Sequence, residues 1–150
     1  MEQEERVTTD DLLCAVKTTR DFRRFRTDHS CDMVVPTLAE YLATLCRNHN
    51  DVPERVIKRA QLDRVYGHQI FSGQKRPSRD KVIQLAFGFF LNVEQTQVLL
   101  RIARKNALYP RMERDAALLY CLSKHKNVLD AQEMLCELGL PLLGDDPERE

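Results

Sequence analysis

Apolar residues in this chain recur at steps of three and four, and nowhere do they alternate with polar residues for long. The pattern is clearest after Pro36, where one helical face carries Leu38, Tyr41, Leu42 and Leu45. Such spacing produces an apolar stripe along one side of an α-helix. Because only five glycines and six prolines occur in 150 residues, turns are few and helices are favoured. The sequence therefore predicts an all-α fold.

Capping residues and helix breakers divide this pattern into successive helices. Asp63 and Ser78 are expected N-caps, Pro53 suits a first helical turn, and Gly73 suits the left-handed position after a helix. We expect helices at about residues 9–19, 37–50, 53–60, 64–72, 78–88, 92–103, 112–124 and 128–138. Residues 21–26 either extend the first helix or form a short one of their own.

Inner faces follow from the same periodicity. The expected apolar positions are Val98, Leu99, Ile102 and Ala103 in the helix at 92–103, and Ala116, Leu119 and Leu122 in the helix at 112–124. The five cysteines are Cys14, Cys31, Cys46, Cys121 and Cys136. All but Cys31 lie within apolar helical patterns, so we expect those four to be buried. An odd number without a Cys-x-x-Cys pair argues against disulfides and a zinc site, and favours reduced thiols in the cytoplasm.

Membrane insertion and export are not expected. No apolar run approaches the roughly 20 residues that cross a bilayer, and residues 1–6 are acidic with no apolar stretch behind them. We therefore expect no membrane partner.

The net charge is zero, but its distribution is uneven. Residues 52–81 contain eight Lys and Arg against three Asp and Glu, a local charge of +5, and residues 82–111 carry +3. The flanks, residues 1–51 and 112–150, carry −3 and −5. Basic charge is therefore concentrated in the middle of the sequence, which suits contact with phosphates there.

Two short helices at 53–60 and 64–72, joined by a tight turn and followed by a glycine and a basic loop, have the layout of a helix-turn-helix. In residues 56–62, 66–73, 75–81 and 85–86 the sequence resembles the lambda-repressor-like, or XRE-type, family of DNA-binding regulators. The resemblance covers about residues 37–103. Residues 107–110, 114–116 and 137–139 are similar to a bacterial subfamily that adds a helical C-terminal extension.

This resemblance implies a domain organisation. Residues 1–35 would form an N-terminal helical segment, residues 36–104 a five-helix core with the helix-turn-helix, and residues 105–150 a two-helix extension with a short acidic tail. In the family the second helix of the motif enters the major groove of double-stranded DNA. The implied DNA-binding residues are Arg64, Val65, His68, Gln69, Gln74, Lys75, Arg76 and Arg79.

The implied contacts divide into two kinds. Arg64 suits guanine, Gln69 adenine, and Val65 a thymine methyl group, so these residues would read bases. Lys75, Arg76 and Arg79 lie in the loop and first turn that follow, and would position the protein on phosphates.

Three positions differ from the family pattern. Gly67 stands where a branched aliphatic residue usually packs the second helix, so that helix is either looser or closely approached by another. Pro53 replaces a glutamine that usually bonds to phosphate. Gln61 replaces the glycine of the turn, so the turn either bends without a left-handed residue or strains this one.

Other interpretations of the same residues stay open. A basic helical face also occurs as plain solvated surface, with Arg64 paired to Asp63 or to another carboxylate and His68 simply exposed. Phe87, Phe89 and Phe90 suit core or interface packing better than a stacking platform for bases. The Leu-rich stripe at 135–143 suits the core or a dimer contact.

The expected function is sequence-specific binding of double-stranded DNA by a bacterial transcriptional regulator, working as a homodimer. The alternative is a protein-interaction module on a helix-turn-helix fold that regulates a partner protein without binding DNA tightly. The sequence contains no Gly-x-Ser-x-Gly, Gly-rich phosphate loop or His-Glu-x-x-His motif, and its four histidines lack ligand spacing. We therefore expect neither an enzyme nor a bound metal or cofactor.

Overall fold

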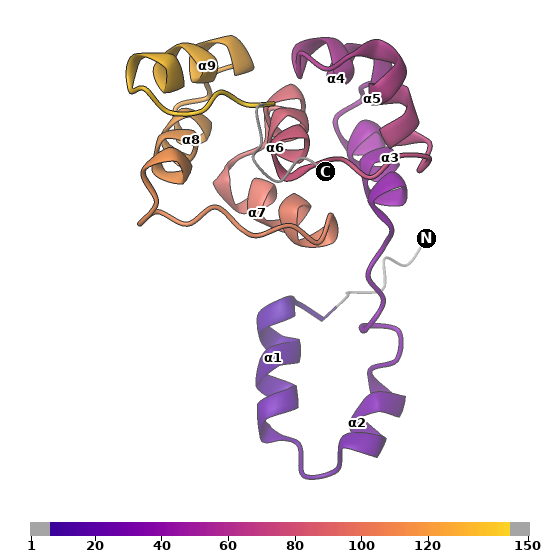
Figure 1. The fold of residues 1–150 in the computed structure, drawn as a ribbon. Coiled ribbons are helices and arrows are strands. Elements are labelled where there is room, and N and C mark those ends of the chain that lie inside the picture. The colour runs from indigo at the N-terminus through magenta and orange to yellow at the C-terminus, as the bar shows by residue number, and fades with distance from the viewer. Residues whose placement is uncertain (1–6, 145–150) are drawn as a thin grey trace. The chain divides into compact units, whose positions relative to one another are not determined.

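The computed structural model describes residues 7–144, and all regular structure in that range is helical (Figure 1). The predicted all-α class is confirmed. The helices are α1 (Thr9–Thr18), α2 (Phe22–Asp28), α3 (Leu38–Asn48), α4 (Pro53–Arg59), α5 (Arg64–Phe71), α6 (Arg79–Gly88), α7 (Val93–Ile102), α8 (Glu113–Ser123) and α9 (Val128–Glu137). The acidic start and the acidic tail noted in the sequence lie outside the described residues.

The chain divides into two compact units, residues 1–35 and 36–150. In the first unit, the side chain of Asp21 accepts hydrogen bonds from the first-turn amides of α2, so this segment is a separate helix rather than an extension of α1. Among the described residues of this unit, Phe25 is the buried apolar side chain, and its ring contacts those of Phe22 and His29. Little apolar surface is therefore buried within the described part of this unit.

The second unit is built around α6, which contacts α4, α7 and α9 (Figure 1). Every residue of α6 from Val82 to Gly88 is buried. Gly88 permits this packing, because a Cβ atom there would lie 2.8 Å from the backbone oxygen of Val56 and 3.1 Å from the Cβ of Ala60, both on the α4 side. The helix that follows the basic loop is thus the centre of the core.

All seven helices from α3 to α9 end in the same way. The residue after each C-cap has a positive φ, and the next amide donates to the carbonyl five residues earlier, which is a Schellman motif. The positive-φ residues are Asn50, Gln61, Gly73, Phe90, Arg104, His125 and Gly139. Since only two are glycines, this glycine-poor chain accepts a strain of about 1 kcal/mol at each of the others.

Two inner faces were predicted correctly only in part, with Leu99 in α7 and Leu122 in α8 buried as expected. In α8 the buried apolar residues are Ala117, Leu118, Cys121 and Leu122, whereas Ala116 and Leu119 are only half-buried. In α7, Val98 is 40% exposed, and Thr96 and Leu100 are buried together with Leu99. The side of a helix that is buried depends on its neighbours, and several adjacent apolar positions fit the same periodicity.

The cysteine prediction is half right. Cys46 and Cys121 are buried, but Cys14 and Cys136 are exposed. Burial raises the pKa of both buried thiols, which keeps them in the unreactive protonated form.

Candidate nucleic-acid interface

The turn between α4 and α5 is made by a strained residue. Gln61 has φ 59°, so of the two alternatives for this position the left-handed one holds. The next amide, that of Leu62, donates to the carbonyl of Ile57 at 3.1 Å and ends α4. Asp63 then caps α5, its carboxylate accepting from the amide of Tyr66 at 3.0 Å. Local capping therefore fixes where α5 begins.

Gly67 allows α5 to approach α4 closely. A Cβ atom at this position would lie 2.7 Å from side-chain carbons of Ile57, which is 2% exposed. The volume that a branched side chain on α5 would fill is thus filled by Ile57 from α4. Together with the burial of Ile70, this contact fixes which face of α5 points inward.

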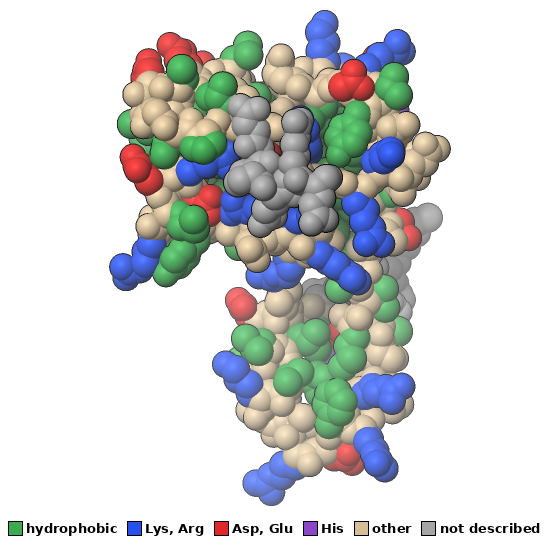
Figure 2. Space-filling view, viewed as in Figure 1, with side chains coloured by type: hydrophobic (Ala, Val, Ile, Leu, Met, Phe, Trp, Pro, Cys, Tyr) green, Lys and Arg blue, Asp and Glu red, His purple; other side chains and the backbone are tan. Residues whose placement is uncertain are grey.

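The opposite face of α5 is exposed. Val65 is 65% exposed, although it is a β-branched apolar residue. One open surface groove is lined by the predicted DNA-binding residues Arg64, Val65, His68, Gln69 and Gln74, together with Ser72. In the space-filling view, Lys and Arg side chains lie around acidic surface over α4 and α5, and Asp and Glu side chains lie over α9 (Figure 2). The structure thus brings five of the eight predicted DNA-binding residues to one groove.

Glu54, in the first turn of α4, contacts two of these residues. Its carboxylate accepts from Nε of Arg64 at 2.8 Å and from Nε2 of His68 at 2.6 Å. The hydrogen bond from His68 and the charge of Arg64 hold the pKa of Glu54 below its ordinary value. The carboxylate partner of Arg64 is therefore Glu54, while Asp63 is a cap. Sequence reasoning missed Glu54, because the pair spans two helices.

The basic loop divides into exposed and internal residues. Gln74, Lys75 and Arg76 are exposed, and Gln69 accepts at its carbonyl from the amides of Gln74 and Lys75. Arg79, by contrast, is turned into the protein, with its side chain 17% exposed. The side chain of Arg79 is therefore not available for the predicted phosphate contact.

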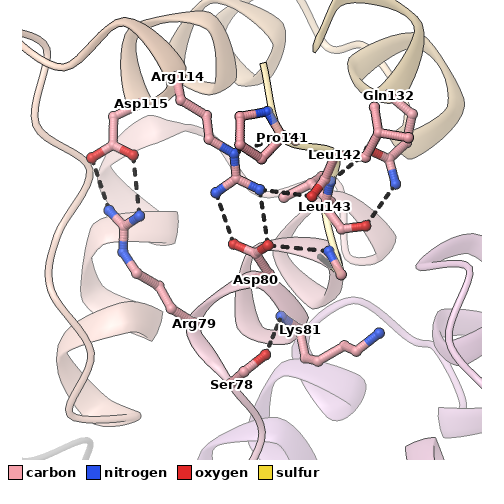
Figure 3. A network of polar contacts seen from close by, with 11 residues as sticks. Ser78, Arg79, Asp80, Lys81, Arg114, Asp115, Gln132, Pro141, Leu142 and Leu143 are labelled. Atoms are coloured by element: carbon pink, nitrogen blue, oxygen red, sulfur yellow. Dashed lines mark hydrogen bonds and ion pairs between the residues drawn. The ribbon is translucent and has the colours of Figure 1, made fainter. Parts of the chain in front are cut away.

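Arg79 instead belongs to a pair of reciprocal ion pairs (Figure 3). It bonds both oxygens of Asp115 at 3.1 and 2.9 Å. Arg114 bonds both oxygens of Asp80 at 3.0 and 2.8 Å. The carboxylates of Asp80 and Asp115 are almost fully buried, so these four residues join the first turns of α6 and α8. Sequence reasoning did not assign Asp80 or Asp115 any role.

The phenylalanine cluster and the Leu-rich stripe are partly buried in the core and partly exposed. Phe87 and Phe89 are in the core, as predicted, whereas Phe90 is 63% exposed with the guanidinium of Arg59 5.0 Å from its ring centre. In the Leu-rich stripe, Leu135 is buried and Leu138 is 51% exposed. Within residues 7–144 the side chains form no cluster of three or more His, Cys, Asp or Glu suited to a metal ion. No helix in the described range is long and apolar enough to span a membrane.

Comparison with known proteins finds no matching family model, no matching curated protein and no matching solved structure.

Proposed function

We propose that this chain binds double-stranded DNA with sequence specificity, as a bacterial transcriptional regulator in the cytoplasm with a lambda-repressor-like core. The observation that carries the proposal is the orientation of α5. Its inner face is held by Gly67 and Ile70, and its outer face presents Arg64, Val65 and Gln69 in one open groove. These are side chains that suit the edges of guanine, thymine and adenine.

The surrounding charge supports the same function. The exposed Lys75 and Arg76 follow α5 directly, at the position from which a helix-turn-helix contacts the backbone of DNA. Residues 52–81 carry a charge of +5, whereas residues 112–150 carry −5. The acidic half of the chain would then face away from the DNA.

A homodimer is part of the proposal. A single module of this kind buries little surface, and two copies reading half-sites about 34–36 Å apart would raise both affinity and specificity.

The experiment begins with selection of duplexes that bind the full chain from a random pool. Affinity for a selected and a scrambled duplex is then measured at about 50 and 200 mM salt, where each neutralised phosphate adds about 0.9 to the log–log slope. We expect a steep slope for both duplexes and a tenfold or greater preference for the selected one, on the order of the lowest specificity ratios of such modules. Absent binding, or a flat slope, would overturn the proposal.

Variants separate base readout from phosphate contact. Arg64→Ala should weaken binding by about 1–3 kcal/mol and relax preference at one base pair, whereas Arg76→Ala should weaken all sequences equally. Arg101→Ala removes the same charge from the exposed surface of α7, outside the groove, and is the control. Equal effects of all three variants would mean that the groove has no special role.

A specific observation favours the second candidate, a protein-interaction module that regulates a partner protein. Glu54 already pairs with Arg64 and His68, and Pro53 has no amide N–H to offer a phosphate. Glu54→Gln distinguishes the candidates. In a DNA-binding protein it frees the side chain of Arg64 and removes a negative charge from the groove, so affinity for duplex DNA should rise severalfold. If DNA does not bind even to this variant, the interaction module is the better function.

A further inference from the structure

The chain repeats itself at an offset of 35 residues. When residues 74–109 are aligned with residues 109–144, eight of 36 positions are identical. The matching pairs are Arg76/Arg111, Arg79/Arg114, Asp80/Asp115, Asn92/Asn127, Val93/Val128, Gln97/Gln132, Leu100/Leu135 and Leu108/Leu143. The alignment superimposes α6 on α8 to within one residue, and places the bounds of α7 on those of α9.

The matched residues make the same contacts within each hairpin. Asn92 closes a capping box at the start of α7, and Asn127 closes one at the start of α9. Gln97 donates to the carbonyl of Leu108 at 2.9 Å and accepts from its amide at 2.8 Å. Gln132 donates to the carbonyl of Leu143 at 2.9 Å and accepts from its amide at 2.7 Å.

Helix ends match as well. The left-handed residues Phe90 and His125 lie at equivalent positions, with φ of 57° and 55°. Arg104 and Gly139 form the next such pair, with φ of 58° and 68°. Because every helix from α3 to α9 ends in this way, the helix ends agree with the repeat, and the shared polar side chains carry the argument for it.

The contacts between the hairpins are reciprocal. Arg79 pairs with Asp115 and also donates to the carbonyls of residues 106 and 107. Arg114 pairs with Asp80 and donates to the carbonyls of residues 141 and 142, which lie 35 positions further on (Figure 3).

Backbone amides add a second reciprocal pair of contacts between the hairpins. The amide of Tyr109 donates to Asp115 at 2.9 Å, and that of Gly144, its equivalent, donates to Asp80 at 3.1 Å. Among the helices, α6 contacts α9 while α7 contacts α8. Exchanging the hairpins thus turns each contact into another that is present, as in a symmetric dimer where residue i contacts j and j contacts i.

We infer that residues 109–144 are a second copy of residues 74–109, and that the two copies pair like the subunits of a symmetric dimer. The face of α6–α7 that carries Arg79 and Asp80 is therefore an interaction surface whose partner is a hairpin of its own kind. In this chain the partner is supplied by the C-terminal extension. The extension is then part of the folding unit of the core, rather than an appended domain.

Hydrogen exchange of the full chain, followed by mass spectrometry, tests this. Asp115→Asn and its equivalent Asp80→Asn each remove the negative charge that faces one buried arginine, Arg79 or Arg114. Each should speed exchange in both hairpins, by on the order of a hundredfold. Asp130→Asn alters an exposed capping residue of α9 and is the control, for which we expect a change confined to the start of α9.

The outcome that overturns the inference is an Asp115→Asn variant in which exchange rises in α8–α9 alone, since the extension would then unfold independently of α6–α7. If either Asn variant does not fold, Arg79→Lys and Arg114→Lys weaken the same ion pairs by less because the charge stays while the paired geometry is lost. These two variants should again speed exchange in both hairpins by similar factors, and clearly unequal patterns would contradict the equivalence of the copies.

Discussion

The hairpins α6–α7 and α8–α9 share their polar contacts and differ in their apolar surfaces. α6 lies between α4 on one side and the second hairpin on the other (Figure 1), and its residues after Lys81 are buried throughout. α8 lies at the edge of the unit and is buried along one face only. The same hairpin therefore occurs in a central and in a peripheral environment.

Sequence differences follow the environments. Phe89 and Leu91 are buried just after α6, whereas their equivalents after α8 are the exposed Lys124 and the half-buried Lys126. Gly88 admits the backbone of α4, whereas its equivalent Ser123 is exposed. The comparison teaches that contacts within and between the hairpins preserve residue identity, while contacts with other elements determine which apolar residues are needed.

The largest expected effect concerns the two ion pairs, whose loss should lower the free energy of unfolding equally in the two hairpins. Arg79→Ala and Arg114→Ala each remove the guanidinium group that pairs with a buried carboxylate, and each should lower the free energy of unfolding by about 3–5 kcal/mol. Urea denaturation of both variants measures this. A difference of more than about 2 kcal/mol between them would mean that the pairs are not equivalent, since context alone changes such values by a factor of about two.

The next largest effect should differ between the hairpins, because Gly88 and its equivalent Ser123 have different surroundings. Gly88→Ala puts a Cβ atom against backbone of α4 and should destabilise the protein by about 1–3 kcal/mol. Ser123→Ala, at the equivalent exposed position, should change the free energy of unfolding by less than about 0.5 kcal/mol. The same denaturation experiment compares them, and similar losses would contradict the central position of α6.

The side-chain amides of Gln97 and Gln132 should contribute equally to the free energy of unfolding, with a smaller effect than the ion pairs. Gln97→Ala and Gln132→Ala each remove two hydrogen bonds to a backbone segment, which should cost about 1–2 kcal/mol in either hairpin. Conservative Gln→Glu variants keep the acceptor but not the donor and should lie between wild type and the alanine variants. An effect in one hairpin only would show that the other segment is held by different contacts.

The smallest effect distinguishes two strained residues. His125→Gly relieves a left-handed conformation and should raise the free energy of unfolding by about 0.5–1 kcal/mol. Phe90→Gly relieves the same strain but loses the contact with Arg59, which is worth about as much, so stability should barely change. Thermal unfolding midpoints measure the difference, and an equal rise in both variants would mean that the Arg59 contact contributes nothing.

Much of the fold could be predicted, because helix boundaries depend on nearby residues. The caps Asp63, Ser78 and Asn92 bond amides within the next three residues, so their spacing alone identifies them. Gly73 ends α5 as expected, at φ 85°. The outward position of Arg64 on α5 also follows from helical periodicity, once Ile70 is placed inward.

Contacts between distant segments could not be predicted in this way. Glu54 and Arg64 belong to different helices, and Arg79 and Asp115 are separated by 36 positions. The 35-residue repeat was present in the sequence as two Arg-Asp pairs and two Asn-Val pairs. Eight matches in 36 positions become meaningful only when the matched residues make the same hydrogen bonds.

Periodicity, caps and charge in the amino-acid order were sufficient for an all-helical chain whose basic middle holds two short helices and a tight turn. These are short-range properties, since a helix forms and ends through bonds between residues a few positions apart. Only the folded chain decided that Arg79 faces inward, that Glu54 pairs with Arg64, and that α8 buries Leu118 rather than Leu119. Burial and ion pairing depend on which surfaces meet, and in this protein one of those surfaces meets a second copy of itself.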